Sequence, residues 1–255
     1  MSNYQIKKEN DFHYVEYGEG PVLLLLHGLF GALSNFEGII RYFSRRFTVV
    51  VPILPIYELP LKEATVMGLK DYVHNFVKYK RFKNMHVLGN SLGGHIALIF
   101  AMDNPETVNS VTLTGSSGLF ENTMGSTFPK RGDYEFIKKK TEDTFYDPSV
   151  ATKDMVDQVY GVVNDRNKAL RILTTAKSAI RSNLRDKLSQ IKVPTLLIWG
   201  KQDKITPPFV GEEFQKHITD SELVLIDQCG HAPMMERPEK FNHYLEKFLR
   251  RISSK

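Results

Sequence analysis

The alternation of short, largely apolar runs with segments of helical periodicity most constrains the fold of this chain. The strand-like runs occupy residues 22–26, 47–51, 86–88, 111–113, 195–199 and 223–226. Such apolar runs are typical of strands buried on both faces of a parallel sheet. Helical spacing of apolar residues occurs at 66–77, 96–101, 209–217 and 241–252. This order predicts an α/β fold with a mostly parallel central sheet and helices on both faces.

One long stretch, residues 118–187, breaks the alternation because its apolar positions fall only at helical spacing. We interpret it as an inserted helical cap, with residues 1–117 and 188–255 forming the core and the sheet resuming at residues 191–194. A length of 255 residues suits one domain with an insertion. We expect most cap aromatic residues to hold the cap together rather than to line a pocket, namely Phe120, Phe128, Phe136, Phe145 and Tyr160.

The composition of the chain limits the expected cellular compartment and the expected binding partners. The single cysteine, Cys229, excludes an intramolecular disulfide, and no basic-then-apolar leader pattern opens the chain, so we expect a cytoplasmic protein. The longest apolar run, residues 21–26, is far shorter than a membrane span. The net charge of +5 is scattered rather than concentrated in a stripe. We therefore expect a monomer or homodimer without nucleic-acid or membrane partners.

The sequence Gly-Asn-Ser-Leu-Gly at residues 89–93 lies between a predicted strand and a predicted helix. This context is typical of a nucleophile elbow, a tight turn that presents a serine at the carboxyl edge of the sheet. Glycines at 89 and 93 would leave room for the neighbouring strand and helix. Ser91 is the predicted nucleophile, and the helix dipole favours negative charge developing beside it.

A serine nucleophile needs a base and a third group that orients the base. His231 follows directly on a predicted buried strand, in Gly-His-Ala-Pro at 230–233, and is the predicted base. Asp203, in the turn after another strand, is the predicted acid. Asp227 is the alternative acid, although its position close to His231 favours a buried structural role. The chain order serine, aspartate, histidine is the order expected on this fold.

A tetrahedral intermediate also needs donors for its oxyanion. The segment His-Gly-Leu-Phe-Gly at residues 27–31 ends the first buried strand. We expect the backbone N–H groups of Leu29 and Leu92 to be these donors, with Phe30 as a substitute for Leu29. His27 is expected to stabilise the loop, while Phe30 and Asn90 are predicted to contact the substrate.

Together these motifs resemble the alpha/beta-hydrolase family, in its subgroup of small cap-bearing serine hydrolases. The resemblance extends from His-Gly at 27–28 to Gly-His-Ala-Pro at 230–233. It implies the same roles for Ser91, Asp203 and His231, and a cap that closes over the acyl or leaving group. The loop at residues 52–60 departs from the family pattern, being apolar and rich in proline, and its Tyr57 or Glu58 are candidates for substrate contact.

Three functions remain open. The first is hydrolysis of small to medium, largely apolar carboxylic esters, with no metal or organic cofactor. The second is carbon–carbon bond hydrolysis of ring-cleavage products, because the elbow is also similar to that of such enzymes. Residue 232 is alanine where those enzymes commonly have tryptophan, whereas Arg166 and Arg171 in the cap are candidates for binding a substrate carboxylate. The third is a ligand-binding receptor without useful turnover.

Overall fold

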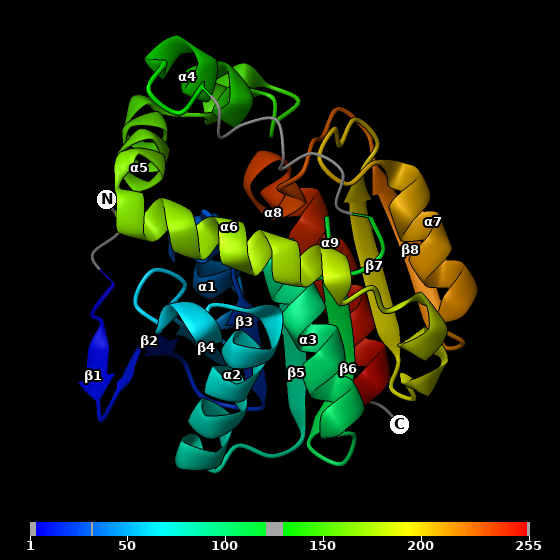
Figure 1. Ribbon diagram of the computed structural model, residues 1–255. Coiled ribbons are helices and arrows are strands. Elements are labelled where there is room, and N and C mark those ends of the chain that lie inside the picture. Colours follow the sequence, from blue (N-terminus) through cyan, green and yellow to red (C-terminus); the bar gives the residue numbers. More distant parts are fainter. Residues whose placement is uncertain (1–3, 32, 121–129, 254–255) are drawn as a thin grey trace.

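The computed structural model describes residues 4–31, 33–120 and 130–253, and within them the strands form one sheet (Figure 1). The strands follow the order β1-β2-β4-β3-β5-β6-β7-β8. Their bounds are β1 (Lys7–Glu9), β2 (Phe12–Tyr17), β3 (Val22–Leu26), β4 (Thr48–Pro52), β5 (Met85–Asn90), β6 (Val108–Thr114), β7 (Thr195–Gly200) and β8 (Ser221–Ile226). Strands β3 to β8 pair in parallel. The predicted mostly parallel sheet is therefore confirmed.

The antiparallel hairpin β1–β2 at one edge was not predicted from the sequence. Its strands pair Glu9 with Phe12, which leaves only Asn10 and Asp11 in the turn. Asn10 has φ 50°, a left-handed conformation that asparagine tolerates and that two-residue hairpin turns require. The turn residues were thus a usable signal, but β1 has only three residues, and β2 buries adjacent rather than alternating residues and so lacks a clear period.

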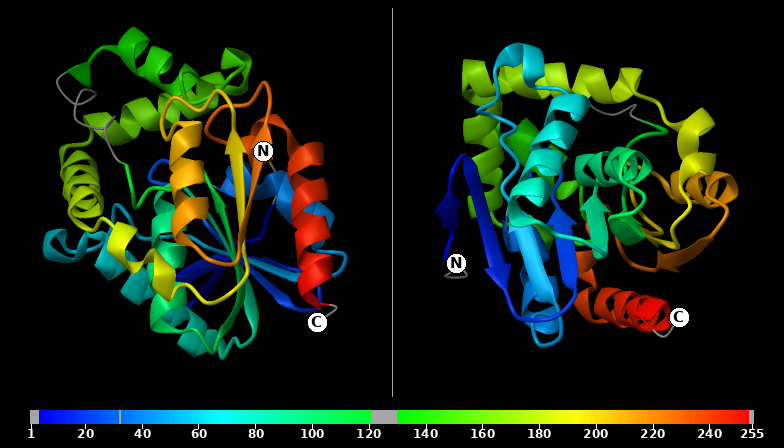
Figure 2. Two further views of the ribbon diagram at one scale, coloured as in Figure 1. Left: turned by 90° about the vertical axis from the view of Figure 1, so that its right-hand side faces the viewer. Right: turned by 90° about the horizontal axis from the view of Figure 1, so that it is seen from below.

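Helices cover both faces of the sheet (Figure 2). One face carries α2 (Val66–Lys80), α3 (Leu92–Asp103) and α7 (Pro208–His217), and the other carries α1 (Glu37–Phe43) and α9 (Pro238–Ser253). The short α8 (Pro233–Glu236) precedes α9. Each face has its own buried apolar cluster, because the side chains of a strand alternate between the two faces. This two-sided burial explains why the strands read as continuous apolar runs.

The segment predicted as a cap contains α4 (Tyr134–Glu142), α5 (Lys153–Asn164) and α6 (Arg166–Arg181). These helices lie across the carboxyl ends of the strands (Figure 1, Figure 2). Side chains of Asp133, Thr152 and Asp165 cap their N-termini by accepting backbone N–H bonds. The described residues also form short 3-10 helices, namely η1 (Leu33–Phe36), η2 (Leu61–Glu63), η5 (Pro148–Val150) and η6 (Arg185–Gln190).

One expectation about this region is wrong, and the cap aromatic residues have mixed surroundings. The sheet resumes at Thr195 and not at residues 191–194, which form no strand, because η6 brings the chain to the base of β7 and Pro194 has no N–H for a ladder. Among the cap aromatic residues, Phe120 packs on Phe209 and Tyr160 packs on Tyr134 at ring-centroid distances of 5.3 and 5.2 Å. Phe145 is buried, and Phe128 lies outside the described residues.

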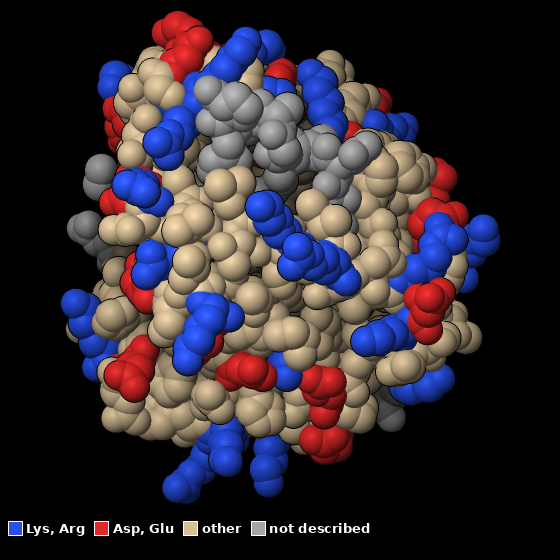
Figure 3. Space-filling view, viewed as in Figure 1, with Lys and Arg blue, Asp and Glu red and all other residues tan. Residues whose placement is uncertain are grey.

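The surface charge is dispersed. Lys and Arg side chains are spread over the face shown in Figure 3, with Asp and Glu side chains among them. Within the described ranges, no helix combines the length and the apolarity that crossing a bilayer requires.

Candidate active site

Ser91 occupies a strained turn between β5 and α3. Its backbone has φ 55° and ψ −119°, a combination that costs energy for any residue with a side chain. The turn is close to its neighbours: a Cβ on Gly93 would lie 2.0 Å from the carbonyl oxygen of Leu26, and one on Gly89 would lie 2.3 Å from that of Gly93. Glycine at 89 lets β5 and α3 meet in this way, and glycine at 93 lets α3 approach the end of β3, as the sequence pattern indicated.

This crowding predicts a large effect of Gly93→Ala on stability. The new methyl group would collide with backbone atoms of Leu26, which have little freedom to move, and we expect a loss of about 3 kcal/mol in the free energy of unfolding. Gly161→Ala is the matched control, because Gly161 lies within α5 with no atom within 4 Å of the added Cβ. Urea denaturation should show Gly161→Ala unchanged or stabilised by up to about 1 kcal/mol. Equal stability of the two variants would contradict the close packing at Gly93.

Asp203 and His231 form a buried pair. The imidazole Nδ1 of His231 donates to Oδ2 of Asp203 at 2.9 Å, and the aspartate side chain is fully buried. The backbone N–H groups of Ile205 and Thr206 donate to Oδ1 at 2.8 and 2.9 Å, and the Thr206 hydroxyl donates to Oδ2 at 2.9 Å. Each carboxylate oxygen is thus held by two donors. Since Nδ1 carries the proton, Nε2 of His231 has a free lone pair.

The backbone of His231 is fixed beside the elbow. Its carbonyl accepts Nδ2 of Asn90 at 3.3 Å, and its N–H donates to the carbonyl of Thr144 at 2.8 Å. Gly115, with φ 51°, lies directly against the ring, since a Cβ there would be 2.7 Å from Nδ1 of His231. The amide of Asn90, predicted to contact substrate, is therefore engaged with backbone carbonyls. Sequence reasoning missed Gly115, which carries no motif signal.

The loop after β3 also reaches the elbow. A Cβ on Gly28 would lie 3.1 Å from Cβ of Ser91. Leu29 and Leu92 are buried, and within the described part of the chain their backbone N–H groups have no acceptor. Unpaired N–H groups are rare in buried backbone, so these two are available to a ligand oxygen. Phe30 is 41% exposed at the same loop.

A carboxylate that sequence reasoning missed supports the histidine loop. Glu236 is buried and accepts the backbone N–H groups of Gly230 and Tyr146, both at 2.7 Å, and of Asp147 at 3.3 Å. It therefore ties the segment before His231 to the chain leading from α4 to α5. Burial raises the pKa of Glu236. No local pattern marks this residue, because its partners are distant in sequence.

His27 and Cys229, near the site, are buried among groups that suit a structural role. Both ring nitrogens of His27 are engaged, one with the carbonyl of Gly28 and one with the N–H of Leu54, and burial lowers the pKa of its ring. Cys229 is buried, and burial together with Glu236 raises the pKa of its thiol to about 12. These surroundings match the structural role expected for His27, and they make Cys229 a buried residue of the histidine loop.

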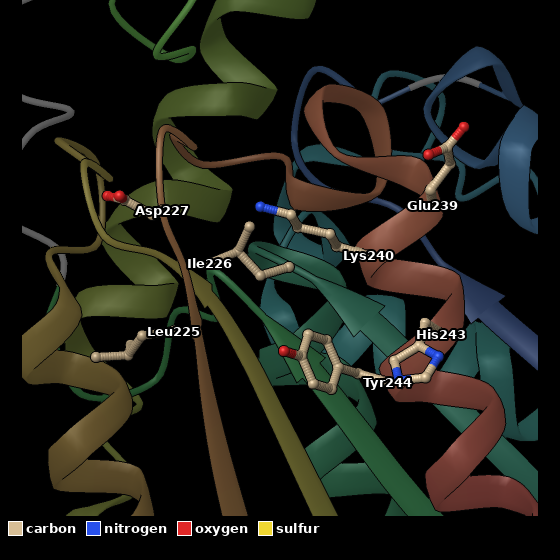
Figure 4. Close-up of a pocket in the computed structure, with 7 residues that line it drawn as sticks. All are labelled: Leu225, Ile226, Asp227, Glu239, Lys240, His243 and Tyr244. Carbon is tan, nitrogen blue, oxygen red and sulfur yellow. The ribbon is translucent and has the colours of Figure 1, made fainter.

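Asp227 does not have the buried role expected of it. Its side chain is 59% exposed and accepts Nε2 of Gln202 at 3.0 Å. It lies at the end of β8, with Lys240 and Tyr244, around a surface hollow between β8 and α9 (Figure 4). The expectation failed because sequence distance from His231 does not reveal that the chain turns outward at this point.

The two cap arginines also differ in their surroundings. Arg171 donates Nε to the carbonyl of Leu59 at 2.8 Å and Nη1 to that of Asn167 at 3.1 Å. Its guanidinium therefore fastens α6 to the loop before η2 instead of projecting freely into solvent. Arg166 is exposed at the start of α6.

Comparisons with known proteins agree with this fold. A family model described as "alpha/beta hydrolase fold" matches residues 21–238. The crystal structure of MGS-MChE2, an alpha/beta hydrolase enzyme from a sediment metagenome of the lagoon of Mar Chica, Morocco, is 41% identical, with a TM-score of 0.81 and coverage of 97% of this chain and 98% of that chain.

Two named relatives have different activities. The monoacylglycerol lipase ABHD6 of Bos taurus is 26% identical over 93% of this chain and 77% of its own length. The 2-hydroxy-6-oxo-6-phenylhexa-2,4-dienoate hydrolase of Comamonas testosteroni is 27% identical over 96% of this chain and 93% of its own length.

Proposed function

Because this chain belongs to the alpha/beta-hydrolase family, we propose that it is a serine hydrolase that cleaves small to medium carboxylic esters. The observation that carries the proposal is the buried hydrogen bond of 2.9 Å between His231 and Asp203. That pair is held beside the strained turn at Ser91 through the contact of Asn90 with the carbonyl of His231. A serine on a nucleophile elbow, a histidine base and a carboxylate that orients this base are the groups that acyl transfer requires.

In the proposed mechanism, Ser91 Oγ attacks the ester carbonyl while Nε2 of His231 takes its proton. Asp203 keeps the imidazole in the required tautomer and stabilises the imidazolium that forms. The N–H groups of Leu29 and Leu92 receive the oxyanion of the tetrahedral intermediate. The imidazolium then protonates the leaving alcohol, and an acyl group remains on Ser91. Water repeats the sequence on the acyl-enzyme and releases the acid.

Aromatic side chains near the same sheet edge support an apolar substrate. Phe30, Phe120 and Phe209 follow the carboxyl ends of β3, β6 and β7, the edge that also carries the candidate catalytic groups. Phe30 and Phe209 are 41% and 47% exposed, so both leave apolar surface uncovered. The named activity of the monoacylglycerol lipase relative adds glycerol esters to the substrates to be tested.

Carbon–carbon bond hydrolysis is a second candidate, supported by the relative from Comamonas testosteroni. This candidate has less support, because Arg171 of the cap already binds backbone carbonyls. In addition, the residue after His231 is alanine. We retain it as an alternative outcome of the substrate test.

The test is a substrate panel run on the purified protein. It contains p-nitrophenyl acetate, butyrate and octanoate, a monoacylglycerol, and 2-hydroxy-6-oxo-6-phenylhexa-2,4-dienoate. We expect kcat/KM for at least one ester to exceed that for the dienoate by about 10²-fold or more. A higher value for the dienoate would favour the carbon–carbon hydrolase. Absence of turnover for every substrate, with Ser91 still labelled by a fluorophosphonate, would indicate a receptor that retains a reactive serine.

A further inference from the structure

The loop that departs from the family pattern packs against the loop that holds the candidate oxyanion donors. We name residues 27–31 the oxyanion loop and residues 53–60, between β4 and η2, the buttress loop. The N–H of Leu54 donates to Nε2 of His27 at 3.0 Å, which is the first link between the two loops. Nε2 must therefore be the unprotonated nitrogen, so Nδ1 of His27 carries the proton.

A second link comes from Tyr57, whose role the sequence left open. Its hydroxyl donates to the carbonyl oxygen of Leu29 at 2.8 Å. Its N–H donates to the carboxylate of Glu58 at 3.1 Å, so the two candidates for substrate contact also bind each other. The Tyr57 hydroxyl is thus committed to the oxyanion loop.

These links fix the directions of two backbone N–H groups. In a planar trans peptide, each carbonyl points opposite to the N–H of the next residue, and the described residues contain no cis peptide bond. The carbonyl of Gly28 accepts the N–H of Gly31 at 3.0 Å and Nδ1–H of His27 at 2.9 Å. The N–H of Leu29 therefore points away from His27 and Gly31.

Among the described residues, Tyr57 alone holds the next peptide by a hydrogen bond. Its hydroxyl holds the carbonyl of Leu29, so the N–H of Phe30 must point away from the buttress loop. Like that of Leu29, this N–H has no acceptor within the part of the chain that the structure describes. Rotating the Leu29–Phe30 peptide would turn the carbonyl of Leu29 and the N–H of Phe30 away from these directions.

We propose that Tyr57 is a positioning residue that holds the Leu29–Phe30 peptide, and through it the oxyanion loop, in the orientation that stabilises the transition state. This inference rests on the proposed function and goes beyond it, because it assigns a task to a side chain outside the candidate catalytic groups. Donors that are already oriented need no reorganisation when negative charge develops, and so they lower the barrier.

The surroundings of Tyr57 suit this task. Burial, followed by the charge of Glu58, raises the pKa of the Tyr57 phenol, so the hydroxyl stays a donor under all ordinary assay conditions. Pro55 stiffens the buttress loop, and its carbonyl accepts the N–H groups of Glu58 and Leu59 at 3.2 and 3.1 Å. Nζ of Lys168, on α6, lies 5.9 Å from the centre of the Tyr57 ring.

The test is Tyr57→Phe, which removes the hydroxyl and keeps the ring. We expect kcat for p-nitrophenyl butyrate to fall by about tenfold, less than for complete loss of a donor, because His27 and Gly31 still hold the preceding Gly28–Leu29 peptide. KM should stay within about twofold, because the ground-state carbonyl interacts weakly with these donors. Inhibition by a trifluoromethyl ketone, which forms an oxyanion on the serine, should weaken by the same factor as kcat/KM.

Tyr42→Phe is the matched control, because it removes a phenol hydrogen bond of 2.9 Å to Glu246, between α1 and α9. It should leave kcat and the inhibition constant unchanged. Titration of reactive sites with a fluorophosphonate normalises kcat to folded protein, so a loss of stability in Tyr57→Phe would not obscure the result.

An unchanged kcat and inhibition constant in Tyr57→Phe would overturn the inference, as would a rise in KM alone, which would place Tyr57 in contact with substrate. Failure of the proposed function would look different, since the wild-type protein itself would not hydrolyse esters. In that case the rates at which a fluorophosphonate labels Ser91 in the wild type and in Tyr57→Phe still test the inference, because phosphonylation also builds charge on an oxygen. A labelling rate equal in the two proteins would overturn it.

Discussion

Replacement of Ser91 by alanine is expected to lower kcat for p-nitrophenyl butyrate by about 10⁶-fold, to the level of the uncatalysed background plus what binding alone provides. The reason is that the Oγ atom of Ser91 forms the covalent bond of the acyl-enzyme in the proposed mechanism. Initial rates from p-nitrophenolate absorbance, at enzyme concentrations high enough to detect residual turnover, measure the effect.

The fold should not change in Ser91→Ala, because alanine and serine have similar costs at φ 55° and the Ser91 side chain accepts no helix-capping hydrogen bond. Circular dichroism and Tm close to those of the wild type would establish this. Ser110→Ala is the control, since Ser110 is a buried serine on β6 whose hydroxyl contacts His86 at 2.8 Å. It should retain wild-type kcat per folded molecule. Substantial turnover by Ser91→Ala would remove Ser91 from the mechanism.

The exchange Asp203→Asn is expected to lower kcat by about 10⁴-fold. Oδ1 of Asp203 accepts two backbone N–H groups, from Ile205 and Thr206, so the asparagine oxygen must occupy that position. Its NH₂ group then faces Nδ1 of His231, which becomes an acceptor and transfers the proton to Nε2. A protonated Nε2 cannot take the proton of Ser91. The variant should therefore fold normally and lose its base.

The control is Asp227→Asn, which makes the same chemical change at the exposed carboxylate around the hollow between β8 and α9. Its kcat should remain within about twofold of the wild-type value. Steady-state kinetics and thermal unfolding of both variants on the same substrate measure the difference. A larger loss of kcat in Asp227→Asn than in Asp203→Asn would contradict the assignment of Asp203 as the acid.

Some features of the fold and of the candidate site depend on neighbouring residues and were predictable from the sequence, whereas others depend on distant residues. Strands β3 to β7 were predictable because burial on both faces demands continuous apolar residues, a property of each segment by itself. The edge strand β8 has the same apolar run, although most of its residues are only partly buried. The strand-turn-helix around Ser91 was predictable for a similar reason, since glycines at 89 and 93 and the following helix lie within a few residues of it. The hairpin β1–β2 was missed because adjacent residues Tyr14 and Val15 are both buried, which hides the period of the strand.

The residues that sequence reasoning missed share one property. Thr206 and Glu236 act through hydrogen bonds to backbone or to a catalytic candidate, and a threonine or glutamate in a loop or short helix looks the same whether or not such a partner is near. Gly115 is recognisable only once the ring of His231 is placed against it. The sequence marked Tyr57 as a candidate for substrate contact, but it did not predict the hydrogen bond of Tyr57 to Leu29 on the oxyanion loop.

The sequence by itself thus determined the layered sheet and the turn at Ser91, because both follow from the period of apolar residues and from the conformational limits of neighbouring residues. Only the tertiary structure decided that Asp203 and not Asp227 meets His231, and that Tyr57 holds the carbonyl of Leu29. Asp203 and His231 are 28 residues apart, and Tyr57 and Leu29 are also 28 apart. The physical reason is that such pairs form where the ends of neighbouring strands converge, and the packing of the whole sheet, rather than any local preference, places those ends side by side.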